Sequence, residues 1–358
     1  MKKILLTGLM TLLVLGLLIP ATGLWLLSHL DRPLEISEQQ VVEVRPGASL
    51  SGVIRGMARD GWLGDEQQAE RTRMAVRLQT MRTGLDQRLH VGEYRVQPGD
   101  SLARLLARFE RGEVIQYAFT LVEGWTFREL RQQMALSPVL ENTLTGLTDE
   151  QVMERLGEPE LLPEGWFAPD TYFFTRAETD LDLLRRALRR QQGILEQAWQ
   201  ARQDDLPLDS PYEALILASI VERETGVPHE RGEIAGVFVN RLRKGMRLQT
   251  DPTVIYGMGE RYDGRIRSRD LREATPWNTY VIWGLPPTPI AMPGEAAIRA
   301  TLDPEETTAL FFVARGDGSH QFSETLREHN EAVRRYQLNR RADYRSFPPA
   351  ETPATEQQ

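Results

Sequence analysis

The chain begins with a long apolar segment that follows a short positively charged end. Lys2 and Lys3 precede an uncharged run from Ile4 to Leu27. At about 1.5 Å per residue, this run exceeds the roughly 30 Å hydrocarbon core of a bilayer. The lysines favour a cytoplasmic N-terminus. We therefore expect a cytoplasmic end at 1–3 and a transmembrane signal anchor over 4–27. A cleaved signal peptide ending near Ala21-Thr22-Gly23 is the alternative.

A weak repeat with an offset of 52 residues follows a short polar link. The sequence VRPGASL begins at Val44 and is matched by VQPGDSL, which begins at Val96. In each copy a strand-like segment meets a Pro-Gly turn, and Ser49 or Ser101 is placed to cap a helix that begins at the next leucine. Apolar residues at helical spacing continue both helices, and the second is expected to end at Gly112.

The remaining chain mixes helices with short strands, so the predicted fold class is α+β. Its clearest helix starts with Ser210 as N-cap, Pro211 at the first helical position and Glu213 completing a capping box. The helix is apolar on nearly all sides, which is typical of a core helix. Gly226 is expected to end it in the left-handed conformation.

Two glutamates lie at the end of this helix. Glu222 and Glu224 are two residues apart, hence roughly 200° apart around the axis, and cannot both face one site. Burial and the negative end of the helix dipole would raise the pKa of the one that faces inward, as a general acid requires. Alternatively, both pair with Arg223, Arg231 or Arg241 at a hydrated helix end.

The segments after this helix have mainly structural readings. A second helix is expected over 230–244, and Asp251 before Pro252 is placed to act as an N-cap, so it need not be a second catalytic carboxylate. Residues 310–322 predict a β-hairpin, in which His320 is expected to be structural. The tail at 347–358 has the composition of a disordered segment.

Composition removes several classes of function. The chain has 51 Asp and Glu against 43 Lys and Arg, so no basic field indicates a nucleic-acid partner. It contains no cysteine, and its five histidines show no metal-ligand spacing. We expect neither a metal nor a cofactor.

Two resemblances extend this reading. Residues 94–102 resemble the opening of a LysM module, a small fold that often binds cell-wall glycans, although strand–turn–helix is also a common way to build a small domain. The wider chain resembles the YceG-like endolytic murein transglycosylases. Four segments carry that similarity: ASIVERET from Ala218, VFVNRL from Val237, GMRLQTDPTVIYG from Gly245, and Asn278 through Gly294.

The resemblance to the YceG-like family implies an architecture and a reaction. It implies a LysM-like domain at 37–118, a YceG-like catalytic domain at 119–340 and a periplasmic location on the inner membrane. Glu224 would be the catalytic acid/base that cleaves the MurNAc–GlcNAc β-1,4 bond of nascent peptidoglycan strands and leaves 1,6-anhydro-MurNAc ends. Penicillin-binding peptidoglycan synthases would lie nearby.

Further residues match motif positions expected to line the cleft: Gln249, Asp251, Thr253, Asn278 and Tyr280. Two positions depart from the family pattern, since Trp277 stands where tyrosine is common and Thr288 where glycine is common. These departures put the detail of the cleft in doubt. Two other functions stay open: a hydrolytic muramidase that uses Asp251 or Glu222 as a second carboxylate, and a noncatalytic wall-binding scaffold.

Overall fold

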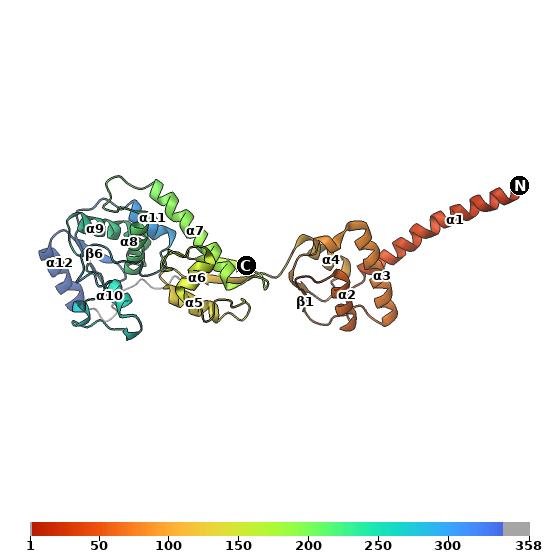
Figure 1. Cartoon of the computed structure of the whole chain (residues 1–358), viewed down its shortest axis with the longest axis horizontal. Coiled ribbons are helices and arrows are strands. Elements are labelled where there is room, and N and C mark those ends of the chain that lie inside the picture. The colour runs from red at the N-terminus through yellow and green to blue at the C-terminus, as the bar shows by residue number, and fades with distance from the viewer. Residues whose placement is uncertain (1, 339–358) are drawn as a thin grey trace. The chain divides into compact units, whose positions relative to one another are not determined.

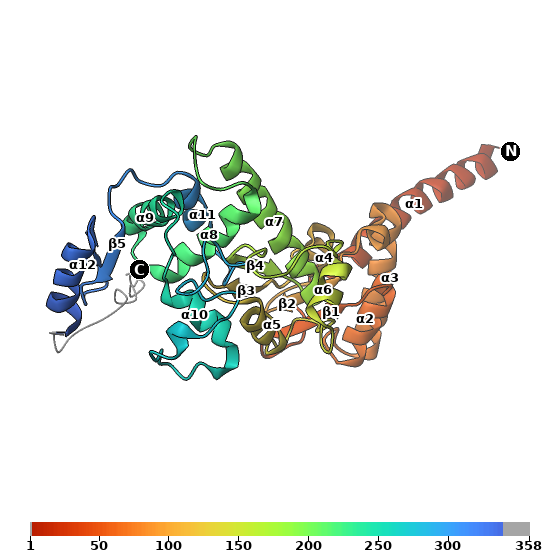
Figure 2. The same cartoon turned by 60° about the vertical axis from the view of Figure 1, so that its left-hand side comes forward.

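The structure is a computed structural model that describes residues 2–338, with the backbone alone for 2–9, 11–13 and 15. It divides into two compact units (Figures 1 and 2). The first comprises Met1–Tyr117 with Phe173–Glu178, and the second Ala118–Tyr172 with Thr179–Gln358. Helices and short paired strands are both present, which is consistent with the predicted α+β class.

The first unit is built around one pair of strands. In chain order it contains α1 (Lys2–Leu27), the 3-10 turn η1 (Ser28–Asp31), β1 (Gln40–Val44), α2 (Leu50–Arg59), α3 (Glu66–Thr83), η2 (Leu85–Arg88), β2 (Gly92–Val96) and α4 (Leu102–Arg111). Strands β1 and β2 pair antiparallel with Val42 opposite Tyr94. Tyr94 is fully buried and packs edge-on against Phe109 of α4. These contacts join the sheet and the helix in one core.

The two copies of the repeat form the capped helices that the sequence predicts. The Ser49 hydroxyl accepts a hydrogen bond from the Gly52 N–H at 3.2 Å, and Ser101 accepts one from Arg104 at 3.4 Å. Gly112 ends α4 in the left-handed conformation at φ 65°. Both caps and this helix end are confirmed.

The predicted membrane span is corrected. Among the residues whose side chains are described, no helix is long and apolar enough to cross a membrane. The expectation of a single-pass inner-membrane protein is therefore wrong on this structure. The predicted tail at 347–358 lies outside the described residues.

The second unit holds most of the helices. In chain order it contains β3 (Tyr117–Leu121, of which Tyr117 belongs to the first unit), α5 (Phe127–Ala135), α6 (Asp149–Leu156), β4 (Asp170–Phe174, of which the last two residues belong to the first unit), α7 (Asp180–Gln200), α8 (Pro211–Glu224), η3 (Pro228–Glu230), α9 (Arg231–Arg243), α10 (Asp251–Met258), η4 (Gly259–Arg261), η5 (Asp270–Arg272), α11 (Glu295–Leu302), β5 (Phe311–Ala314), β6 (His320–Ser323), α12 (Leu326–Val333) and the π-helical turn η6 (Arg334–Leu338). Strand β3 pairs with β4, and β5 with β6.

Helix α8 is the core helix of this unit, as predicted. Its residues 214–221 are buried, and it packs against α7, α9, α10 and α11 (Figure 2). Ser210 caps it by accepting from the Glu213 N–H at 3.2 Å. The Glu213 carboxylate accepts instead from the Asp209 N–H at 2.6 Å, so the predicted capping box is only half formed.

The end of α8 differs from the prediction. The helix stops at Glu224, and Thr225 is extended, with φ −138° and ψ 136°. Gly226 is therefore not a left-handed stop, and the chain leaves the helix straight after the glutamate. The carboxyl end of α8 meets the N-terminus of α10 through the hydrogen bond between Glu224 and Thr250.

The predicted hairpin at the C-terminal side is confirmed by the antiparallel pairing of β5 with β6. His320 is buried there, and its Nδ1 lies 2.7 Å from Oε2 of Glu230. The backbone N–H of His320 donates to the other carboxyl oxygen at 2.9 Å. The histidine therefore ties β6 to the start of α9, in agreement with the structural role expected for it.

Candidate active site

Glu224 is the last residue of α8, and its side chain is half-buried. The hydroxyl of Thr250 donates a hydrogen bond to Oε1. Burial raises the pKa of Glu224 to about 7, and the nearby charge of Asp251 adds to this effect, while the Thr250 bond and the Arg241 cation act against it. In the part of the chain that the structure describes, no cationic side chain forms an ion pair with this carboxyl. Both of its protonation states are thus populated near neutral pH.

Two other threonines hold the Thr250 backbone in place. The Thr250 N–H donates to Oγ1 of Thr279 at 3.0 Å, and its carbonyl accepts from the Thr253 hydroxyl at 2.7 Å. The hydroxyls of Thr253 and Thr279 lie 2.8 Å apart. Since each hydroxyl has one proton and that of Thr253 goes to the carbonyl, Thr279 donates to Thr253. All three residues are buried.

Asp251 is not the N-cap of α10, as the sequence suggested. The cap position belongs to Thr250, and Asp251 is the first helical residue. The Thr250 hydroxyl makes no capping bond, because it is directed to Glu224. The Asp251 carboxylate is exposed and accepts from the Tyr280 hydroxyl at 2.7 Å. The exposed carboxyl of Asp251 at the start of α10 therefore follows directly after Thr250, the residue that bonds to Glu224.

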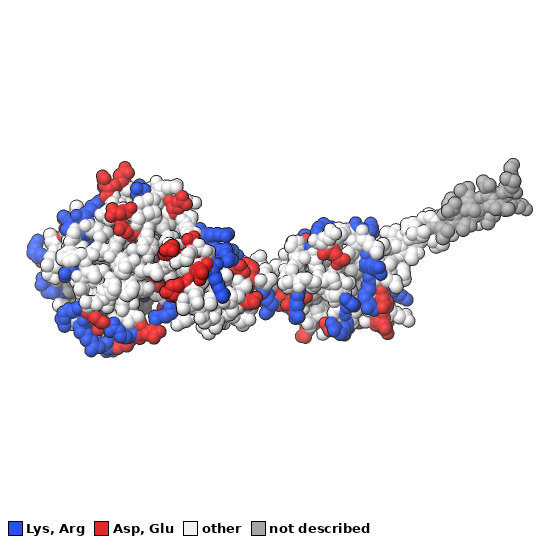
Figure 3. Space-filling view, in the orientation of Figure 1, with Lys and Arg blue, Asp and Glu red and all other residues white. Residues whose placement is uncertain are grey.

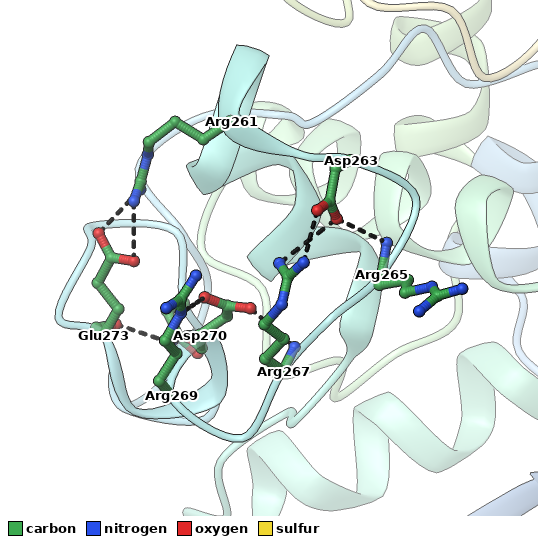
Figure 4. Close-up of polar contacts among 8 residues, drawn as sticks. Arg261, Asp263, Arg265, Arg267, Arg269, Asp270 and Glu273 are labelled. Atoms are coloured by element: carbon green, nitrogen blue, oxygen red, sulfur yellow. Dashed lines mark hydrogen bonds and ion pairs between the residues drawn. The ribbon is translucent and has the colours of Figure 1, made fainter.

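Asn278 anchors the loop that precedes the site. It is buried, and its amide donates to the carbonyls of Asp270 and Glu273 at 3.1 and 2.7 Å. Its oxygen accepts from the Tyr280 N–H at 3.0 Å. The loop surface carries arginine–carboxylate pairs, such as Arg261 with Glu273 at 2.8 Å (Figure 4). Exposed ion pairs contribute little to stability. The buried amide of Asn278 is therefore the main interaction that holds this loop.

Figure 4 also shows how the arginines of this loop are matched by acids. Arg267 lies 2.5 Å from Asp263, and Arg269 lies 3.5 Å from Asp270. Blue and red atoms alternate over this unit in Figure 3. The loop is therefore a mixed-charge surface, in keeping with the absence of a basic field in the composition.

Gln249 is held in an uncommon backbone conformation next to the site. Its φ is +49°, a left-handed value that is rare for residues with a side chain, and its N–H donates to the Thr279 carbonyl at 3.2 Å. The side chain is exposed. Of the five expected cleft residues, Gln249 and Asp251 are thus exposed, Tyr280 is half-buried, and Thr253 and Asn278 are buried in hydrogen bonds.

Glu222 occupies a different environment from Glu224. One oxygen accepts from the Gly294 N–H at 3.0 Å, and the other lies 3.8 Å from a guanidinium nitrogen of Arg231. Arg231 is also 3.7 Å from Glu123. The alternative in which both glutamates are paired therefore describes Glu222 and not Glu224. The two carboxyls share no partner, as the helix geometry implies.

A second buried carboxyl, Glu164, was missed in the sequence. Its two oxygens accept from the Phe127 N–H at 2.9 Å and the Tyr256 hydroxyl at 3.0 Å. Burial raises the pKa of Glu164 to about 7. It lines a cavity of about 700 Å³ in the second unit. The signal in the sequence was a glutamate set directly before an aromatic run, Glu164-Gly165-Trp166-Phe167.

The two residues that depart from the family pattern touch each other. The indole N–H of Trp277 donates to the hydroxyl oxygen of Thr288 at 2.8 Å. Both residues line the same cavity as Glu164. Thr288 thus supplies the acceptor that the Trp277 indole needs.

Glu224 is the candidate acid–base group of this unit, because its pKa, raised to about 7, suits proton transfer near neutral pH. The described residues include no cluster of ligands for a metal ion. The chain belongs to the YceG-like family, whose family model matches residues 42–335.

The chain is also similar to relatives that have assigned names. The chain is 38% identical over 173 residues to an endolytic murein transglycosylase of Bacillus subtilis, a match that covers 48% of each chain. It is 26% identical over 279 residues to a protein of the same name from Streptococcus pneumoniae, covering 68% of this chain and 50% of that one. The chain thus spans about half the length of the curated relatives it matches.

A solved structure is also similar. A crystal structure of a yceG-like protein from Listeria monocytogenes matches with 25% identity and a TM-score of 0.47. The match covers 82% of this chain and 99% of that one.

Proposed function

We propose that this protein is an endolytic peptidoglycan lytic transglycosylase that uses Glu224 as its single acid/base. The observation that carries the proposal is the Glu224 carboxyl, which lies at the end of a core helix, accepts a hydrogen bond from Thr250 and has its pKa raised by burial to about 7. The names of the curated relatives support the reaction class. The bond cleaved is the β-1,4 bond between MurNAc and GlcNAc.

The reaction needs one carboxyl in two roles. Protonated Glu224 gives its proton to the glycosidic oxygen as the bond from the MurNAc anomeric carbon to that oxygen breaks. The resulting carboxylate takes the proton from the C6 hydroxyl of the same MurNAc, whose oxygen forms the new bond to the anomeric carbon. The products are a 1,6-anhydro-MurNAc end and a free GlcNAc hydroxyl, and no water is consumed. A pKa near the working pH suits both steps.

The neighbours of Glu224 have supporting roles in this mechanism. The Thr250 bond to Oε1 leaves Oε2 as the oxygen that carries the proton. The exposed side chains of Gln249 and Asp251 are placed to meet the sugar, and Tyr280 orients Asp251 through its hydroxyl. Thr253, Thr279 and Asn278 position these residues from the buried side.

The domain roles follow the same proposal. Residues 119–340 would form the catalytic domain and 37–118 a LysM-like domain that contacts the wall polymer. The strand–turn–helix arrangement of β2 and α4 supports the second assignment. Cleavage within nascent strands would end their elongation, and contact with penicillin-binding synthases stays a prediction from the family resemblance.

Product analysis tests the reaction. Purified peptidoglycan is digested with the wild-type protein and with Glu224→Gln, and new chain ends are identified by mass spectrometry. We expect anhydro ends from the wild type and none from the variant, with the melting temperature of the variant no lower. Unchanged cleavage by Glu224→Gln would sink the assignment, and a wild type that binds glycan without cutting it would support the scaffold alternative.

A hydrolytic muramidase is the second candidate, because Asp251 is close enough to Glu224 to raise its pKa. In that reaction Asp251 would activate a water molecule, and inverting glycosidases use two carboxyls in this way. The products would be reducing MurNAc ends without anhydro sugar. Loss of cleavage in Asp251→Asn, with reducing ends in the wild type, would favour it over the transglycosylase.

A further inference from the structure

The cavity that contains Glu164 adjoins the acid–base site through two backbone segments. Arg223 and Pro252 line the cavity, and they are the chain neighbours of Glu224 and Asp251. Neighbouring Cα atoms are about 3.8 Å apart, so the same ends of α8 and α10 form both the cavity wall and the site. Its volume of about 700 Å³ falls within the range of ligand pockets, about 300–1,000 Å³.

Aromatic side chains in the cavity wall are fixed by hydrogen bonds. The Trp277 indole N–H is committed to Thr288 at 2.8 Å. Tyr256 meets the Trp277 ring edge-to-face, with centroids 5.4 Å apart, and donates its hydroxyl to Glu164. These rings are therefore held in place before any ligand arrives, which lowers the entropic cost of binding.

The charge of the lining argues against an anionic occupant. Five carboxylates and two guanidinium groups line the cavity: Glu129, Asp149, Glu150, Glu164 and Glu260, with Arg128 and Arg223. Arg128 is paired with Glu260 at 3.4 Å, and Asp149 is paired with Arg131 outside the lining at 2.7 Å. The surplus of acids would repel the carboxylates of peptide branches.

A neutral sugar ring fits the remaining chemistry. A pyranose presents C–H groups on its faces, which pack against aromatic rings, and hydroxyls at its edge, which bond to carboxyl and guanidinium groups. Each oxygen of Glu164 accepts one bond from protein and keeps a second lone pair for a ligand hydroxyl. The lining thus offers both surfaces that a sugar requires.

We propose that this cavity is a saccharide subsite, in which Trp277 and Tyr256 receive GlcNAc, the uncharged sugar of the strand, next to the bond at Glu224. The identity of the polymer rests on the proposed function. The subsite itself rests on the cavity, its fixed aromatic rings and its charge. It would select for the glycan backbone and against the peptide branches.

Binding measurements on the full chain carrying Glu224→Gln test the subsite without turnover. The probes are chito-oligosaccharides, peptide-free glycan strands and released stem peptides, titrated by calorimetry. Adding Trp277→Ala should weaken binding of both glycans about tenfold, the usual size for loss of a central aromatic contact. Trp199→Ala is the matched control, because Trp199 lies outside the cavity lining and stacks with Arg202 at 4.0 Å. The Trp199→Ala variant should bind both glycans with unchanged affinity.

Two milder variants keep the test decisive if the alanine variant fails to fold. Trp277→Tyr keeps a ring at the position. Thr288→Val removes the acceptor that holds the indole, together with the bond from Thr288 to the Pro289 carbonyl. Both should weaken glycan binding by a smaller factor than the alanine change, roughly threefold. The subsite proposal would be overturned if all of the Trp277 and Thr288 variants that fold bound glycans as tightly as Glu224→Gln alone. Binding of stem peptides in preference to glycans would overturn it as well.

Failure of the subsite and failure of the function give different results. If the wild type releases anhydro ends while glycan affinity does not change in the Trp277 variants, the subsite proposal is wrong and the proposed reaction is retained. If glycan affinity depends on Trp277 while the wild type cleaves nothing, the reaction is wrong and the subsite stands.

Discussion

Thr250 donates its hydroxyl to the carboxyl of Glu224, so the cap residue of α10 fixes the terminal residue of α8. The hydroxyl of an N-cap threonine ordinarily satisfies the N–H groups of its own helix. Here it serves another helix, and the backbone of Thr250 is secured by two further threonines. The position of the Glu224 carboxyl therefore depends on threonines that take no part in proton transfer themselves.

Thr250→Val should move the pH optimum of cleavage upward. The hydroxyl stabilises the charged form of Glu224 and lowers its pKa, so its loss raises the pKa above about 7. The protonated form of Glu224, which starts the reaction, then persists to higher pH. We expect the alkaline limb of the kcat/KM profile to move to higher pH in this variant. Thr250→Ser keeps the donor and should behave as wild type; an unshifted pH profile in the valine variant would contradict this account.

Glu164 should make the protein less stable as the pH rises. Its folded pKa of about 7 lies above the usual 4.5, so the folded state holds the proton more tightly than the unfolded chain does. This stabilisation is complete below about pH 4.5 and is lost as the pH rises through about 7. The loss is on the order of 3 kcal/mol. Denaturant unfolding at pH 5 and pH 8 measures it: the stability difference between wild type and Glu164→Gln should move in favour of the variant at pH 8.

Asn278→Ala should destabilise the loop before the site. The change strands the buried carbonyls of Asp270 and Glu273 and the N–H of Tyr280. An unsatisfied buried group costs about 1–3 kcal/mol, so we expect a loss on the order of 3 kcal/mol. Arg261→Ala removes an exposed pair with Glu273 in the same loop and should cost less than about 1 kcal/mol. Similar melting temperatures for the two variants would show that the buried amide is not the main tie.

Gln249→Gly separates backbone strain from substrate contact. Glycine relieves the left-handed conformation at φ +49° but adds freedom to the unfolded chain, and the two effects nearly cancel. We expect stability to change by less than about 1 kcal/mol while the KM for glycan rises, because the exposed amide is gone. Gln249→Asn keeps a shorter amide and should lie between the two. A glycine variant with wild-type KM would remove Gln249 from the substrate-binding set.

The sequence revealed those parts of the fold that depend on local chemistry. The caps at Ser49, Ser101 and Ser210 involve residues three positions apart, and each is present. The cap of α10 was placed one residue late, because Asp251 and Thr250 both suit the position and only tertiary contacts decide between them. The membrane span was inferred from hydropathy. Among the residues whose side chains are described, no helix is long and apolar enough to form such a span.

The site was harder to foresee than the helices. Glu224 could be singled out as an expensive carboxyl at a buried helix end, but its partner lies 26 residues away in the chain. Glu164 meets Tyr256 across 92 residues. No periodicity links such positions, since they meet only when α10 lies against the end of α8 and against the segment that contains Glu164. Family resemblance selected Glu224, and the structure adds the groups that hold it.

The pairing of β1 with β2 gives the 52-residue repeat a further meaning. Val42 and Tyr94 are equivalent positions in the two copies, and they are also direct cross-strand partners. An antiparallel pair centred on equivalent residues has local twofold pseudosymmetry, so each copy supplies the edge that the other lacks. Removal of either copy would leave an unpaired strand with an exposed apolar face. In this respect the strand pair of the first unit resembles the interface of a symmetric dimer whose two subunits are joined in one chain.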